Sequence, residues 1–141
     1  MSQENVEVVR SLLNDLSQGD LEAAAGHLSA GVEWDTSARG SDGSVVHGRE
    51  AAISVIREWL DVWEDASFYI VDIRGAGDRV AAHARQNARG KGSGLRGEVD
   101  GFAAYEFAEG KIEAYREYPT WADCLKAVGL QEQLSQENVD A

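Results

Sequence analysis

The stretch GVEWDTSARGSDGSVVHGREAAISVIREWL, residues 31–60, holds the two patterns that decide the fold. Its VEW, residues 32–34, is a short apolar run typical of a strand, and the run ends on an acid, Asp35. The segment TSARGSDGS that follows has the composition of a loop. From about Arg49 to Trp63, apolar residues recur at helical spacing over a broad face, which predicts a long helix packed against a sheet.

The residues before this stretch predict two further helices. Over residues 3–17, apolar side chains recur with helical period. The sequence QGD, residues 18–20, breaks that pattern, and Asp20 is placed to cap a second, shorter helix that runs through Leu28.

The residues after it change period. From about Ser67 to Tyr118, apolar and polar residues alternate in four segments separated by short Gly-containing turns, which predicts an antiparallel meander of four strands. A last helix begins after Thr120, which can cap it, and Gly129 followed by Leu130 is typical of a glycine C-cap.

This order of elements predicts one α+β domain over residues 1–130, with a polar tail at 131–141. We expect the helices to lie on one face of a curved antiparallel sheet, and the bent sheet to leave a cavity for a small ligand. The pentapeptide SQENV occurs at residues 2–6 and again at 135–139, and it is too short to be a structural repeat.

Composition limits the function. The chain has 141 residues and a net charge of −12, so we expect no nucleic-acid partner and no binding to anionic membranes. No apolar run is long enough for a bilayer, and the polar N-terminus predicts no secretory signal. With one cysteine and three scattered histidines, we predict no metal site, no cofactor and a cytoplasmic location.

Several short motifs together resemble one known superfamily. They are QGDLEAA, VEWD, the HGRE that opens the long helix, the GKI turn and the closing YPTWADCLKAVGL. Over residues 3–130 their order and spacing resemble the nuclear transport factor 2-like superfamily, in its SnoaL-like and ketosteroid-isomerase-like branches. The resemblance implies a cone-shaped α+β fold and a homodimer formed through the outer face of the sheet. It leaves the reaction open, because such folds include isomerases, cyclases, dehydratases, epoxide hydrolases and domains without catalysis.

Asp35 is the first candidate for chemistry. The resemblance places it where ketosteroid isomerases have their general base, and a partly desolvated aspartate can take a proton from carbon. The alternative is a strand-end acid that caps the following loop through Thr36 and Ser37. Strict strand alternation places Trp34 and Asp35 on opposite faces, so Asp35 faces away from the core if Trp34 faces it.

The sequence departs from the isomerase pattern at the oxyanion hole. Leu12 stands where the resemblance expects a tyrosine, and Ala103 stands near the position of the second acid. Without those donors, about 3 kcal/mol or more of transition-state stabilisation is missing. We therefore do not expect steroid isomerase activity.

Aromatic residues are candidates for the walls of the cavity, and core packing is the alternative for each of them. The predicted pocket-lining set is Trp34, Trp59, Trp63, Tyr69, Tyr115, Tyr118 and Trp121.

A polar stripe crosses two of the predicted strands. His83 and Arg85 share one strand face, and Arg96, Glu98 and Asp100 follow on the next strand. By resemblance, the stripe is a remnant of the water-activating groups of epoxide hydrolases or dehydratases. By strand geometry, it is a solvated face or a dimer contact made of cross-strand ion pairs.

Two hypotheses follow. In the first, the protein binds a small hydrophobic, ring-containing or polyketide-like molecule and acts on it by acid/base catalysis, with Asp35 as the base and His83 and Tyr105 as groups that polarise the substrate. In the second, it is a non-catalytic ligand-binding or dimerisation domain.

Overall fold

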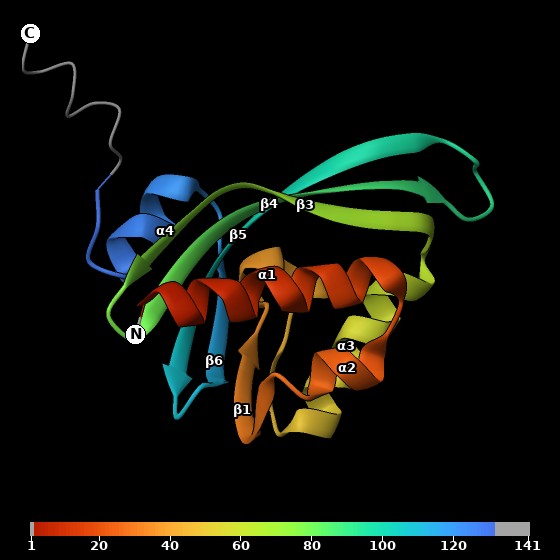
Figure 1. The fold of residues 1–141 in the computed structure, drawn as a ribbon. Coiled ribbons are helices and arrows are strands. Elements are labelled where there is room, and N and C mark those ends of the chain that lie inside the picture. The colour runs from red at the N-terminus through yellow and green to blue at the C-terminus, as the bar shows by residue number, and fades with distance from the viewer. Residues whose placement is uncertain (1, 132–141) are drawn as a thin grey trace, which may run out of the picture.

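A computed structural model describes residues 2–131 of the chain, and Figure 1 shows their arrangement. The elements follow in the order α1 (Ser2–Gln18), α2 (Leu21–Ala25), β1 (Leu28–Asp35), the 3₁₀ helix η1 (Ser37–Asp42), β2 (Val45–His47), α3 (Arg49–Asp61), β3 (Trp63–Ala76), β4 (Arg79–Gly90), β5 (Arg96–Ala108), β6 (Lys111–Tyr118) and α4 (Trp121–Ala127). Most of the predicted tail and the second SQENV copy lie outside the described residues. The division at residue 130 therefore stays a prediction.

The strands form one curved sheet in the order β2-β1-β6-β5-β4-β3. The meander β3–β6 is antiparallel throughout, as predicted, whereas β1 joins β6 in parallel. The pairing of β3 with β4 shifts register between Glu64 and Ser67, where Asp65 takes a φ of 56°. Such irregularities bend a strand and increase its twist. The predicted cone-shaped α+β fold is confirmed.

Helix α1 crosses the concave face of the sheet (Figure 1) and packs on β3. Its stripe of apolar residues lies in the core, with Val9 and Leu12 almost completely buried. The first turn of α1 meets the end of β3 at Gly75, where a Cβ would lie 2.9 Å from the Cβ of Ser2. A glycine there permits the close approach of helix and strand.

Helix α2 is shorter than predicted. Its N-cap is Asp20, whose carboxylate accepts a hydrogen bond of 3.0 Å from the backbone N–H of Ala23, as the sequence indicates. The helix ends at Ala25, and Leu28, expected as its last residue, begins β1.

Two elements were absent from the prediction. The segment predicted as a loop contains the 3₁₀ helix η1, which is kinked at Gly40, where φ is 75°. The residues VVH form the three-residue strand β2, antiparallel to β1, with Val46 opposite Trp34. Both elements are too short for a periodic pattern to reveal them.

Helix α4 lies on the opposite face of the sheet from α1 and α3, which corrects the expectation that the helices share one face. Its Cys124 and Leu125 are completely buried against Ala81 and Ala104. The physical reason is strand alternation: Ala81 points away from the side on which Val80 and Ala82 join the main core.

The ends of α4 match the sequence prediction. Thr120 accepts a hydrogen bond of 3.1 Å from the backbone N–H of Asp123. Gly129 has a φ of 86°, and the N–H of Leu130 bonds back to the carbonyl of Leu125 at 2.8 Å. In residues 2–131, no helix is long and apolar enough to cross a membrane.

Candidate functional site

A cavity of about 480 Å³ lies between helices α1 and α3 and the concave face of the sheet. Its floor is made of small residues: Ala82 lies opposite Ala103 in the pairing of β4 with β5, and Ala84 lies opposite Gly101. Side chains this short do not reach the helices above them. The sequence thus leaves the space empty by placing alanine and glycine at alternate positions on two neighbouring strands.

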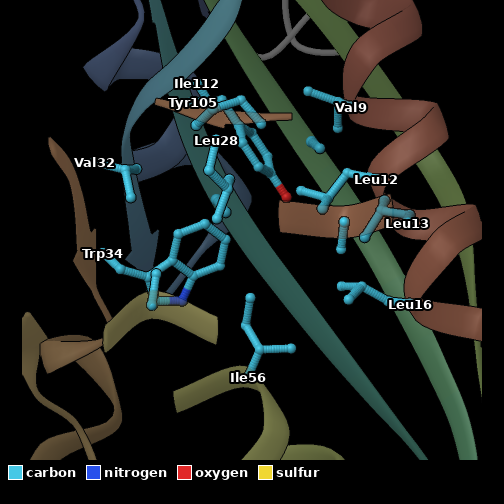
Figure 2. Close-up of a cluster of buried hydrophobic side chains, with 14 of the residues drawn as sticks. Val9, Leu12, Leu13, Leu16, Leu28, Val32, Trp34, Ile56, Tyr105 and Ile112 are labelled. Carbon is cyan, nitrogen blue, oxygen red and sulfur yellow. The ribbon is translucent and has the colours of Figure 1, made fainter. Parts of the chain in front are cut away.

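Aromatic rings form one wall of the cavity. The rings of Trp34 and Tyr115 are stacked with their centroids 3.8 Å apart, and Tyr105 meets Tyr115 edge-on at 5.2 Å. Figure 2 shows Trp34 and Tyr105 projecting toward Leu12 and Ile56, which come from the helices on the other side. These contacts hold flat, rigid surfaces around the open volume.

A polar cluster lies on the same wall. Arg39 from η1 donates two hydrogen bonds, of 2.8 and 2.7 Å, to the two carboxylate oxygens of Glu117 on β6. The Tyr115 hydroxyl donates to the same carboxylate at 2.5 Å. The guanidinium of Arg39 also lies 4.8 Å from the centre of the Trp59 ring, in cation–π geometry. Arg39, Tyr115 and Glu117 all line the cavity.

Burial sets the protonation state of this cluster. It raises the pKa of Tyr115 well above its ordinary value, and the negative charge of Glu117 raises it further. Burial alone would lower the pKa of Arg39, but the hydrogen bonds and charge of Glu117 outweigh it, so that pKa is raised. At neutral pH Tyr115 therefore stays a hydroxyl donor and Arg39 stays a cation.

A second polar group lies further along β4. The indole N–H of Trp59 on α3 donates a hydrogen bond of 2.7 Å to Oε1 of Gln86. Gln86 is only 5% exposed and lines the cavity, and its Nε2 is buried without a hydrogen-bond partner. A lone buried amide of this kind needs an explanation, because buried polar groups are normally paired.

A comparison with family models gives one match, the SnoaL-like domain, over residues 9–115. The chain belongs to the SnoaL-like domain family. This confirms the predicted resemblance to the nuclear transport factor 2-like superfamily. A comparison with curated proteins gave no match.

Solved structures share the SnoaL-like fold at low sequence identity. A protein of ketosteroid-isomerase-like fold from Catenulispora acidiphila, in complex with trimethylamine, is 19% identical, with a TM-score of 0.71 over 88% of this chain and 93% of that one. A candidate SnoaL-like polyketide cyclase from Jannaschia sp. CCS1 is 18% identical, with a TM-score of 0.73 over 93% and 95%. An LEH-like epoxide hydrolase from M. tuberculosis is 20% identical, with a TM-score of 0.68 over 90% and 86%. These likenesses establish the fold.

Of the three predicted catalytic residues, only Tyr105 lines the cavity of this SnoaL-like domain. Asp35 is on the other face of β1 from Trp34, in register with Arg116, whose Nε lies 3.4 Å from the Asp35 carboxylate. Ser37 donates two hydrogen bonds to that carboxylate, from its backbone N–H at 2.9 Å and from its hydroxyl at 2.6 Å. Asp35 thus holds the start of η1, which is the alternative that the sequence offered.

The electrostatics of Asp35 agree with this placement. Burial alone would raise its pKa, but the hydrogen bonds from Ser37 and the charge of Arg116 outweigh burial, and the pKa is lowered. A carboxylate with a lowered pKa is a weak base. The predicted role of Asp35 as a general base does not fit its geometry.

His83 also lies outside the cavity lining. Its ring is 4.6 Å from that of Phe102 and 5.9 Å from that of Trp121, on the face covered by α4. On the neighbouring position of this face, Arg85 donates a hydrogen bond of 2.6 Å to Asp100. Of the predicted polar stripe, Arg85 therefore makes a cross-strand contact with Asp100, which also borders the cavity, and His83 lies on the same outer face.

The predicted pocket-lining aromatics divide into two groups. Those that line the cavity are Trp34, Trp59, Tyr115 and Tyr118, and those that do not are Trp63, Tyr69 and Trp121. Trp121 packs on the outer face with α4, and Tyr69 is 43% exposed next to Arg85. Trp63 contacts Trp59 edge-on, behind the residue that reaches the cavity.

Four polar lining residues, Arg39, Asp42, Gln86 and Glu117, were not predicted from the sequence. Alternation contains a signal for two of them: Gln86 continues the inward series of Ala82 and Ala84, and Glu117 follows Tyr115 by two positions. Arg39 and Asp42 have no such signal, because both lie in a non-periodic segment. Within residues 2–131, no three or more acidic, His or Cys side chains are arranged to hold a metal ion.

Proposed function

We propose that this SnoaL-like protein binds a small, ring-containing, largely apolar molecule in the cavity on the concave face of the sheet. The observation that carries the proposal is an open volume of about 480 Å³ between stacked aromatic rings and aliphatic side chains, with polar groups at only a few points. Cavities that bind small molecules commonly have this volume and this mixture of apolar walls and a few polar groups.

The ion pair of Arg39 with Glu117 gives the ligand an orientation. The lining consists largely of apolar atoms, with Asp42 and Asp100 as its other charged residues, and Tyr115 holds the Glu117 carboxylate in place. A polar end of the ligand gains hydrogen bonds there, while its rings stay against Trp34 and Trp59.

The same cluster bears on catalysis. If the protein transfers protons, Glu117 is a candidate carboxylate, because it lines the cavity, as Asp42 and Asp100 also do, whereas Asp35 does not. Both oxygens of Glu117 already accept hydrogen bonds from Arg39 and Tyr115, which lowers its reactivity as a base. The geometry therefore supports ligand binding more strongly than acid/base catalysis.

Binding is tested by screening planar apolar compounds for an increase in the melting temperature of the full chain. A ligand present at 100 times its Kd stabilises the folded state by about 2.7 kcal/mol. Because Trp34 and Trp59 line the cavity, ligands are also expected to change the tryptophan emission. A panel of such compounds without any stabiliser would contradict the proposal.

Two variants test whether the ligand binds inside the cavity. Ala84→Leu extends a side chain into the open volume and is expected to weaken every ligand at least tenfold. Trp121→Phe, on the outer face, serves as the control and is expected to leave affinity unchanged. Glu117→Gln is expected to weaken only ligands with a polar end. Product analysis by mass spectrometry after incubation with each ligand then distinguishes an enzyme from a binding protein.

We also propose that the protein is a cytoplasmic homodimer, formed through the part of the outer sheet face that α4 leaves uncovered. The exposed apolar residues Tyr69 and Val71 on β3 support such a contact. The test is a mass measurement in solution across a range of concentrations. A constant mass of 15.3 kDa would contradict dimerisation, and recovery of the protein outside the cytoplasmic fraction of its cells would contradict the location.

A further inference from the structure

The pentapeptide SQENV occurs twice in the chain, and its first copy makes a contact with the sheet. Twenty residue types make an exact repeat of five residues rare by chance in a chain of 141. Residues 2–6 form the start of helix α1. The second copy, residues 135–139, lies outside the described residues. The contacts of the first copy therefore indicate what the second copy can bind.

The first copy packs on the end of β3. A Cβ added to Gly75 would lie 2.9 Å from the Cβ of Ser2 and 3.2 Å from Cγ2 of Val6. The hydroxyl of Ser2 donates a hydrogen bond of 3.4 Å to the carbonyl of Gly77, in the turn between β3 and β4. Asn5 and Val6 are only 6% and 8% exposed. The surface around Gly75 and Gly77 is thus a seat for one helical turn, and we call it the α1 seat.

The exposure of these five residues follows helical spacing. Ser2, Asn5 and Val6 lie on the side of the sheet, whereas Gln3 and Glu4 are exposed. The second copy has the same residue at each position, so a helical turn formed by it would present the same surface. The first copy has one advantage, because it continues into the remaining turns of α1 and so needs no separate helix nucleus. It therefore holds the α1 seat in the structure.

The chain leaves α4 close to the α1 seat. Arg79, at the start of β4, donates a hydrogen bond of 3.1 Å to the carbonyl of Ala127 at the end of α4. In the pairing of β3 with β4, Arg79 lies opposite Ala76, next to the seat. Figure 1 shows the N-terminal end of α1, the turn between β3 and β4, and α4 at the same end of the molecule.

The second copy can reach the seat from there. Helix α4 is on the outer face, so the chain has to pass the turn between β3 and β4 to arrive at α1. The four steps from Gln131 to Ser135 span up to about 14 Å when extended. In the first copy, the residue that bonds to this turn is Ser2, the first of the five. A chain that arrives at the turn therefore enters the seat in the same direction as α1.

We propose that residues 135–139 are a second occupant of the α1 seat, which they fill when the first turn of α1 leaves it. Helix ends fray more readily than helix interiors, so the first turn is the part of α1 that vacates its place most easily. The two copies exclude each other, because a single helical turn covers Gly75. Neither Gly75 nor the first copy lines the cavity, so this inference is independent of the proposed ligand.

The test is a double-mutant cycle on the full-length chain, measured by urea denaturation. Val6→Asp places a charge in the α1 seat and expels the first turn of α1, and Val139→Asp makes the same change in the second copy. Val139→Asp alone is expected to leave stability unchanged. In the Val6→Asp background, it is expected to raise the equilibrium constant for unfolding about tenfold, because the second copy then fills the seat. Additive effects of the two changes overturn the proposal.

Gln136→Asp is the matched control. It introduces the same side chain into the second copy, at the position that corresponds to the exposed Gln3. We expect it to leave stability unchanged in both backgrounds, and an effect as large as that of Val139→Asp would overturn the proposal. If Val6→Asp does not fold by circular dichroism, Val6→Ala replaces it, because it removes buried methyl groups without adding a charge.

The dependence on protein concentration identifies the chain that supplies the second copy. A segment tethered to the same molecule has a fixed effective concentration, so the coupling between Val6→Asp and Val139→Asp should be the same in dilute and concentrated samples. Coupling that appears only in concentrated samples would assign the segment to another molecule and would overturn the proposal.

Discussion

The two faces of the sheet are built from the same strands, but one borders an open cavity and the other is packed against a helix. On the concave face, Ala82 and Ala84 leave a cavity beneath α1 and α3, whereas on the outer face Ala81 lies directly under α4. On β1, neighbouring residues separate in the same way: Trp34 lines the cavity, and Asp35 bonds to Ser37 and lies near Arg116. One step along a strand thus decides whether a side chain lines the cavity or packs on the outer face.

The largest expected effect is on the outer face. Leu125→Ala removes a completely buried side chain from α4 and is expected to lower the free energy of unfolding by about 2–5 kcal/mol. Urea denaturation measures this loss. Because α4 lies on the side opposite the cavity, ligand affinity should not change.

The matched control on the concave face is Leu60→Ala in α3. Leu60 lines the cavity and is partly exposed, so its loss should cost less stability and should weaken ligand binding. The same effect of both substitutions on affinity would show that the two faces are not independent.

A pair of alanines sharpens the comparison. Ala81→Leu inserts a larger side chain into the packed contact with Leu125 and is expected to cost about 1–3 kcal/mol of stability. Ala84→Leu places the same side chain in open volume, so we expect little loss of stability together with loss of binding. Urea denaturation measures the free energy of unfolding of each variant, and ligand titration measures its affinity. Equal destabilisation by the two changes would argue against an empty cavity.

A smaller effect concerns acid stability. The pKa of Asp35 is lowered from 3.8 in the folded state, so this carboxylate stabilises the fold above that value, and the contribution is lost as the pH falls through the lowered pKa. Asp35→Asn should therefore be less stable by about 1 kcal/mol at neutral pH. The difference from wild type should shrink as the pH falls below 3.8 and through the lowered pKa. Urea denaturation at a series of pH values measures it.

Glu33→Gln provides the control for that experiment. Glu33 lies on the same strand with a side chain that is 49% exposed, and the side chain of its partner His47 is 68% exposed. We expect its loss to leave the acid limb of the stability curve unchanged. An Asp35→Asn variant with the same pH dependence as wild type would show that Ser37 does not stabilise the ionised carboxylate.

The smallest effect is expected at the ion pair between Arg85 and Asp100. Both side chains are accessible to water on the outer face, where such pairs contribute little. Arg85→Gln should leave the melting temperature of a dilute sample unchanged. A loss of stability that grows with protein concentration would instead place this pair in a contact between two copies of the chain.

Much of the fold follows from sequence periodicity, because each long element buries one regular face. The alternation around Trp34 already implied that Asp35 turns away if the tryptophan faces the core. The polar cluster could not be predicted, because Arg39 and Glu117 are 78 residues apart and meet only after η1 folds over β6. The position of α4 was also missed, since a seven-residue helix does not reveal which side of a sheet it will cover.

Chemical labelling of Cys124, the single cysteine, can report when helix α4 detaches from the sheet. Cys124 belongs to α4, and its thiol is completely buried between this helix and the sheet. Burial also raises the pKa of the thiol to about 12. While α4 stays packed on the sheet, a thiol-modifying reagent therefore cannot reach the sulfur, and little reactive thiolate is present. Labelling must wait until the helix detaches. The labelling rate in native buffer therefore reports how often this part of the molecule opens without unfolding the rest.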